Sequence, residues 1–150
     1  MANTKKHLKN QKNKKRSSCK NARIKRMPGL EFKPDYVKSV SEPWFTLIAL
    51  GIKKVEGRLD KGSFSQMESG NIVEWTNSDF GMRKVITRIT RKTKYASFRE
   101  YLEAEGLSNC LPGITSVDMG VAIYHKYYEP VEEVVNGVLA IELEVLMVKS

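Results

Sequence analysis

Hydrophobic and polar positions change their spacing several times between residues 37 and 148, and each change marks a new element. Runs in which apolar residues alternate with polar ones predict strands at 37–40, 53–59, 70–77, 83–95 and 137–148. Apolar residues three and four apart predict helices within 41–51, 98–107 and 117–128. The segment 107–113 is interpreted as a loop. Strands and helices in this order predict an α+β domain.

Serine side chains stand where each predicted helix begins. Ser41, Ser97 and Ser116 are expected to cap the three helices, and Glu100 completes a capping box with Ser97. Gly51 is a good stop for the first helix.

Trp44 shares one face of the first helix with Leu47 and Ile48. A tryptophan on such a face usually packs in the core, and we expect this of Trp44 rather than stacking on a ligand.

The chain has 150 residues, of which 41% are hydrophobic, which suits one domain with a real core. No apolar run is long enough to cross a membrane, so we expect an intracellular protein without membrane contact, and a monomer. Cys19 and Cys110 are isolated, as are His7 and His125. The sequence therefore predicts no metal site, no disulfide framework and no cofactor.

Positive charge is concentrated at the N-terminus. Residues 1–27 hold 11 lysines and arginines and no acidic residue, which leaves 15 basic and 17 acidic residues for the remainder. Self-repulsion and a lack of apolar surface predict a disordered basic arm, with a linker that extends it to residue 36. Residues 37–150 are the predicted domain, and the arm is expected to contact nucleic-acid phosphates, or to serve only as a solubilising or localisation tail.

The segment Gly51–Arg58, GIKKVEGR, places charges of both signs where a helix meets a strand. Glu56 and Arg58 are two apart and share one strand face, with Lys53 close by. Such a trio can hold a planar polar ligand, because arginine donates in pairs and glutamate accepts. An exposed surface ion pair is the competing interpretation. We expect Glu56 to raise the pKa of Lys53.

The run Ser-x-Pro-Trp-x-x-Leu-Ile-x-x-Gly-x-Lys-x-x-Glu-x-Arg, residues 41–58, resembles the signature of the ASCH domain family. The stretches 70–75, 95–102, 111–113 and 137–143 are similar to that family as well. The resemblance implies a PUA-like fold, which is a small curved β-barrel with helices covering its ends.

Members of this family are thought to bind RNA or modified nucleosides in a cleft beside the Gly-x-Lys-x-x-Glu-x-Arg segment. One branch removes an acyl group from a cytidine base, using a threonine nucleophile three residues after the lysine, and another member is reported as a ribonuclease. Here Glu56 occupies the threonine position. A carboxylate does not substitute for an activated hydroxyl in that role.

A basic strand is the best candidate within the domain for contacts to backbone phosphates. Its basic residues are Arg83, Lys84, Arg88, Arg91, Lys92 and Lys94. The aromatic residues leave two interpretations open. Trp75 either packs in the core or faces a ligand, and Tyr124, Tyr127 and Tyr128 form either a stacking platform for RNA or, as we expect, the packed end of a helix.

RNA binding is the function that these observations favour, with a nucleotide held near Lys53, Glu56 and Arg58. The alternative is a hydrolase acting on a modified nucleoside or RNA, with Lys53 as base and Glu56 as its partner. A protein-interaction module tethered by the basic arm is a third possibility, and it would show an exposed apolar patch.

Overall fold

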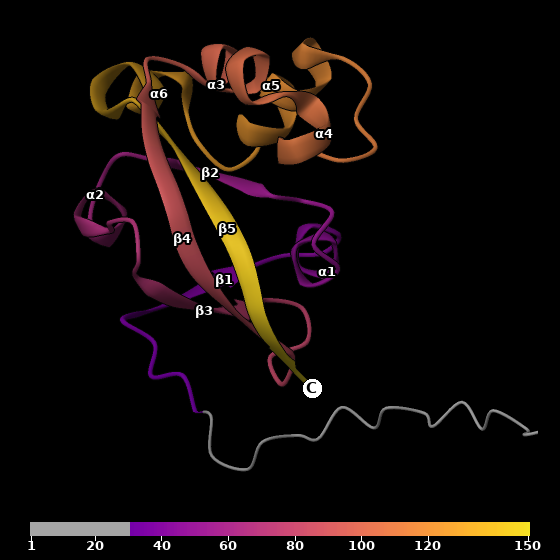
Figure 1. The fold of residues 1–150 in the computed structure, drawn as a ribbon. Coiled ribbons are helices and arrows are strands. Elements are labelled where there is room, and N and C mark those ends of the chain that lie inside the picture. Colours follow the sequence, from indigo (N-terminus) through magenta and orange to yellow (C-terminus); the bar gives the residue numbers. More distant parts are fainter. Residues whose placement is uncertain (1–30) are drawn as a thin grey trace, which may run out of the picture. The chain divides into compact units, whose positions relative to one another are not determined.

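A computed structural model describes residues 31–150, which form one compact unit (Figure 1). The predicted basic arm, with Cys19 and His7, lies outside the described residues. Five strands of the described chain form one mixed sheet in the order β1-β3-β4-β5-β2. Their bounds are β1 Tyr36–Val40, β2 Val55–Leu59, β3 Ile72–Asn77, β4 Lys84–Tyr95 and β5 Val138–Lys149. The α+β class and the predicted strands are confirmed.

Two long antiparallel strands, β4 and β5, form the middle of the sheet (Figure 1). Their ladder is interrupted between Ile86 and Thr87 and again between Ile89 and Arg91. Such bulges add one residue to a strand, bend it and increase its twist. The bends help the twelve-residue strands to curve around the core instead of lying flat.

The sheet is not a closed barrel, which corrects that part of the expected fold. Within residues 31–150, β1 pairs only with β3, in parallel, and β2 pairs only with β5. The two edge strands are instead linked by a side chain, since Arg58 Nη2 on β2 donates to the Ser39 carbonyl on β1 at 2.9 Å. We call the unpaired gap between β1 and β2 the seam.

Helices α3, α4, α5 and α6 gather at one end of the β4–β5 pair, whereas α1 and α2 lie beside the sheet (Figure 1). The helices span α1 Trp44–Ala49, α2 Ser63–Gln66, α3 Phe98–Glu105, α4 Leu107–Cys110, α5 Val117–Tyr124 and α6 Pro130–Asn136. The short α2, α4 and α6 were not anticipated from the sequence. The third predicted helix ends at Tyr124, and a turn carries the chain through Tyr128.

Serine caps are confirmed at α3 and α5 but are wrong at α1. Ser97 accepts from the Glu100 amide, and Ser116 accepts from the Met119 amide. At α1 the Glu42 side chain takes this role, because its carboxylate accepts from both the backbone amide and the hydroxyl of Thr46. Helix α1 begins at Trp44 with Pro43 at the N-cap position, so Ser41 lies two residues too early in the chain to cap its first free amides.

Two apolar clusters fill the domain. One lies against the curved sheet and includes Phe45, Ile48 and Trp75. The other joins β2 and the start of β5 to α3, α4 and α5, and includes Phe98 and Tyr101. Trp75 is fully buried and donates its indole N–H to Thr87 at 2.9 Å, which places it in the core rather than at a ligand.

The acidic side chain of Glu133 holds α6 against the other helices. One carboxylate oxygen accepts from the Phe98 amide at the start of α3, and the other lies 2.7 Å from His125 Nε2. The opposite side of α6 turns Val131, Val134 and Val135 to solvent. None of the helices in residues 31–150 has the length and apolar character needed to span a membrane.

Candidate functional site

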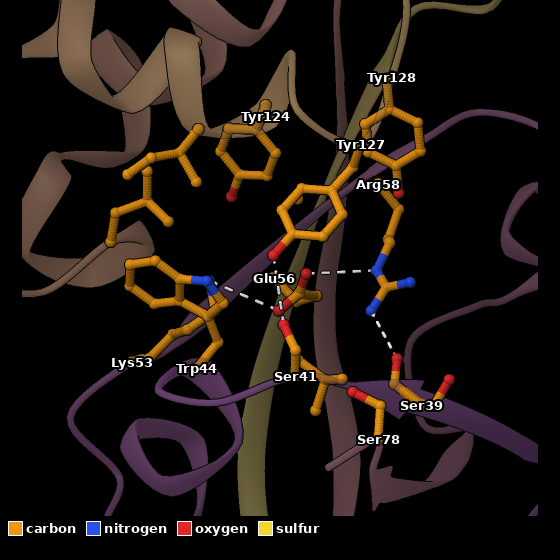
Figure 2. A pocket seen from close by; sticks show the side chains of 14 residues that line it. Ser39, Ser41, Trp44, Lys53, Glu56, Arg58, Ser78, Tyr124, Tyr127 and Tyr128 are labelled. Carbon is orange, nitrogen blue, oxygen red and sulfur yellow. Dashed lines mark hydrogen bonds and ion pairs between the residues drawn. The ribbon is translucent and has the colours of Figure 1, made fainter.

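A cavity of about 230 Å³ opens at the seam, where the two edge strands approach without pairing (Figure 2). Its polar lining comes from Ser39, Ser41, Lys53, Glu56, Arg58 and Ser78. Its aromatic lining comes from Trp44, Tyr124, Tyr127 and Tyr128. The cavity therefore combines the predicted charged trio with ring systems from α1 and from the end of α5.

Glu56 is the centre of the charged trio. Its carboxylate lies between two cations, with Oε2 at 3.5 Å from Lys53 Nζ and Oε1 at 3.2 Å from Arg58 Nε (Figure 2). The residue is only 6% exposed, which rules out the solvated surface pair considered from the sequence. Glu56 Oε2 is buried and finds no hydrogen-bond partner anywhere in residues 31–150. A buried acceptor left in this state is destabilising unless a ligand or water satisfies it.

Lys53 is held by acceptors on three sides. Its ammonium donates to the Val55 and Cys110 carbonyls and faces Glu56, and the residue is 2% exposed. Burial lowers the pKa of Lys53, and Glu56 opposes this change without overcoming it. The expected upward shift was wrong, because the sequence contains no measure of how completely the side chain is removed from water.

The guanidinium of Arg58 links Glu56 to the other edge strand. Nε donates to Glu56 while Nη2 donates to Ser39 across the seam. The guanidinium carbon also lies 5.1 Å and 5.4 Å from the ring centres of Phe64 and Trp75. Stacking on aromatic rings leaves the planar donors in a fixed orientation. Lys53 and Arg58 thus both contact Glu56 and hold its carboxylate at the cavity.

Gly57 lets two buried tyrosines approach the site from the other face of β2. A Cβ at this position would lie 2.8 Å from atoms of both Tyr101 and Tyr124. The two hydroxyls are 3.0 Å apart, and burial raises the pKa of each tyrosine well above its usual value. Both phenols therefore remain neutral hydrogen-bonding groups at physiological pH.

The tyrosines at the end of α5 and in the turn after it both pack at the helix end and line the cavity. Tyr124 and Tyr128 both stack on the Phe98 ring, with ring centres 4.3 Å and 5.6 Å away. Both also line the cavity. Tyr127 is 60% exposed, and its hydroxyl lies 3.3 Å from Ser41 Oγ at the β1–α1 corner (Figure 2).

Trp44 was expected in the core. It packs against both apolar clusters, but it is half-buried and also lines the cavity. Helix α1 is only six residues long, and it buries Phe45 and Ile48, which are three apart. Trp44 lies at the edge of that buried face. The aromatic lining was hard to predict, because it requires α1 and the turn after α5 to meet at the seam. In the sequence, the cluster of Tyr124, Tyr127 and Tyr128 was the one indication of this aromatic lining.

The basic side chains of β4 and its preceding turn are engaged with neighbouring groups. Five pair with carboxylates: Arg83 with Glu42, Lys84 with Glu74, Arg88 with Glu144, Arg91 with Glu105 and Glu142, and Lys94 with Asp60. Lys92 donates to the Ser65 carbonyl. None of these six lines the cavity, so the structure does not bring them together with Lys53, Glu56 and Arg58. Their contact with phosphates stays a prediction.

A mixed sheet with helices at its end and a cavity beside the charged trio defines a PUA-like domain. The ASCH domain profile matches residues 39–147, and the chain belongs to this family. The crystal structure of hypothetical protein PH0355 is similar at 34% identity and a TM-score of 0.68, covering 74% of this chain and 98% of that one. The solution structure of protein PF0455 from Pyrococcus furiosus shares 35% identity at a TM-score of 0.60, covering 74% and 96%. No curated protein matches the chain.

Proposed function

We propose that this protein binds RNA and takes one nucleotide into the cavity at the seam. The observation that carries the proposal is Glu56 Oε2, a buried carboxylate oxygen that lies 3.5 Å from Lys53 Nζ but accepts no hydrogen bond in the described chain. Glu56 lines a cavity with aromatic walls. An N–H group on a nucleobase would supply the missing hydrogen bond. The rest of the site is built to hold that carboxylate in place.

The size and lining of the cavity also support a base-sized ligand. At about 230 Å³ it is smaller than the roughly 300–1,000 Å³ typical of sites for drug-sized molecules. Single-stranded RNA presents unstacked bases that bind by stacking on aromatic side chains and by hydrogen bonds to their edges. Trp44 and Tyr127 offer ring surface for such stacking at the cavity.

A hydrolase is the second candidate, and one observation favours it: burial lowers the pKa of Lys53, as a catalytic base requires. The hydrogen bonds of Lys53 argue against that role. Its ammonium already donates to two carbonyls and faces Glu56, so it has no free position from which to accept a proton from a substrate. We therefore place binding ahead of catalysis.

The test is the affinity of the full chain for short single-stranded RNA, measured by fluorescence anisotropy for wild type and Glu56→Gln. Glutamine keeps the size of the side chain but removes the charge that Lys53 and Arg58 hold. We expect at least about tenfold weaker binding, since losing a charged hydrogen-bond partner costs about 1.5–3 kcal/mol. Glu144→Gln is the matched control, because Glu144 is exposed and pairs only with Arg88 among the described side chains. Equal affinity of wild type and Glu56→Gln, with both folded, would overturn the proposal.

A further inference from the structure

We infer that the cavity reads the hydrogen-bonding edge of a base through Glu56 Oε2 and the backbone of Gly57, and that it excludes phosphate. This inference rests on the proposed function and names the part of the nucleotide that enters. It assigns a recognition role to the free edge of β2, which the charged motif alone does not suggest.

The backbone of Gly57 points away from β5. In the antiparallel pairing of β2 with β5, Lys54 accepts a hydrogen bond from Leu143, and the Asp60 amide donates to the Gly137 carbonyl. Residues that bond towards the partner strand alternate with residues whose N–H and C=O point outwards. Gly57 is therefore an outward position of β2.

The neighbouring outward position supports this direction. Val55 turns its carbonyl to Lys53 Nζ at 2.8 Å, on the side away from β5. Within the described part of the chain, the Gly57 N–H donates no hydrogen bond to a side chain or loop, and its C=O accepts none. Gly57 follows Glu56 in the chain and lines the same cavity, so its backbone offers one donor and one acceptor there.

Together, these three groups form a pattern that a nucleobase edge can match. Glu56 Oε2 and the Gly57 carbonyl both accept, and the Gly57 amide donates. A ligand must offer a ring N–H or amino group together with a carbonyl oxygen or ring nitrogen on one edge. The unsubstituted bases of RNA carry such pairs of groups on their Watson–Crick edges.

Phosphate does not fit the same groups. It finds fewer donors than the sequence suggests, because Lys53 bonds to two carbonyls and faces Glu56, and Arg58 uses Nε for Glu56 and Nη2 for Ser39. The cavity-lining group that still lacks a hydrogen bond belongs to the Glu56 carboxylate, which repels an anion. The sugar–phosphate backbone of a bound RNA would thus remain outside the cavity.

The experiment compares three kinds of short RNA on the full chain: unmodified homopolymers, the same homopolymers with the Watson–Crick N–H groups methylated, and an abasic backbone of equal length. Binding is measured by anisotropy at about 0.3 M salt, where backbone contacts are largely screened. We expect at least one unmodified homopolymer to bind at least about tenfold more tightly than its methylated form, because a site with unpaired polar groups rejects a ligand that cannot satisfy them. Glu56→Gln should remove this discrimination, whereas Glu144→Gln should keep it.

Each other outcome has a distinct meaning. If the abasic backbone or the methylated RNA binds as well as unmodified RNA, the base-edge inference is overturned while RNA binding stands. If Glu56→Gln discriminates as well as wild type, recognition lies elsewhere and the inference fails again. If none of the RNAs binds at any salt concentration, the proposed function fails, and this inference fails with it.

Discussion

Arg58 on one edge strand donates through Nη2 to the carbonyl of Ser39 on the other edge strand, at 2.9 Å. A side chain thereby spans a gap that a continuous backbone ladder would close in a complete barrel. The same guanidinium donates through Nε to Glu56. One planar group therefore sets both the width of the seam and the position of the carboxylate in the cavity.

Arg58→Lys should weaken RNA binding by about tenfold and lower the free energy of unfolding by about 1–2 kcal/mol, while the domain still folds. Lysine keeps the charge but lacks the two donors in fixed geometry that join Glu56 to Ser39. Binding and denaturant unfolding measure the two effects. Arg88→Lys is the control, since Arg88 forms an exposed pair with Glu144. Binding by Arg58→Lys equal to that of wild type would mean that the charged trio is not part of the ligand site.

Gly57→Ala should destabilise the domain by about 1–3 kcal/mol, because the added methyl group would overlap Tyr101 and Tyr124. The shift of these rings should also weaken RNA binding. Gly81→Ala provides the comparison, since a Cβ at Gly81 meets nothing within 4 Å, and its effect should stay within about 0.5 kcal/mol. Denaturant unfolding checks both variants. A Gly57→Ala protein as stable as wild type would show that the tyrosines can move aside.

Local signals explain how much of the fold was predictable. Alternating apolar positions located the strands, and Ser97 and Ser116 marked helix starts by hydrogen bonds within a few residues of each serine. Closure of the sheet is a long-range property. The sequence does not show whether Tyr36–Val40 pairs with Val55–Leu59, so the expected barrel was wrong at that one place.

The unfolding free energy of wild type should rise relative to that of Lys53→Met as the pH increases from neutrality towards 10.5, the ordinary pKa of lysine. Burial lowers the folded-state pKa of Lys53. Above that lowered pKa the unfolded chain binds more protons than the folded one, and stability then increases with pH. Tyr101 and Tyr124, whose pKa values burial raises, oppose this trend equally in both proteins. Denaturant unfolding across this range gives the difference, and a difference that is flat or falls with pH would show that the pKa is not lowered.

Deleting residues 1–27 should flatten the dependence of the logarithm of RNA affinity on the logarithm of salt concentration. The deleted segment holds 11 basic residues, and the remainder has 15 basic and 17 acidic residues, a formal net charge of −2. On single-stranded RNA, the slope falls by about 0.7 for every phosphate that the shortened protein no longer neutralises. Salt titrations of the full and shortened chains test this, and identical slopes would show that the arm is not a nucleic-acid element.

The candidate site was predictable only in part, because its members come from separate segments. Lys53, Glu56 and Arg58 were visible because they lie within six residues of one strand and its approach. The sequence did not show what each of these three side chains contacts in the folded domain. Only the structure shows that Lys53 is buried, that it bonds to the Val55 and Cys110 carbonyls, and that it lies 3.5 Å from the Glu56 carboxylate.

Release of the acyl group from N4-acetylcytidine should not occur at an appreciable rate. The reaction needs a nucleophile, a base to activate it and donors for the oxyanion. Lys53 is surrounded by acceptors, and among the described residues no hydroxyl donates a hydrogen bond to its Nζ. Ser41 lines the cavity, and its hydroxyl lies 3.3 Å from that of Tyr127. Glu56 stands at the position where a hydroxyl nucleophile would be required, so catalysis would need a water molecule held by its carboxylate.

The measurement is product formation from N4-acetylcytidine by the purified full chain, with Lys53→Ala as the comparison. Equal background rates for the two proteins are expected, even where binding of the nucleoside is detected. Turnover by wild type that disappears in Lys53→Ala would contradict this prediction. It would mean that Lys53 gives up a proton despite its carbonyl acceptors, because ligand binding displaces one of those hydrogen bonds, and the hydrolase would then replace the binding protein as the better description of the site.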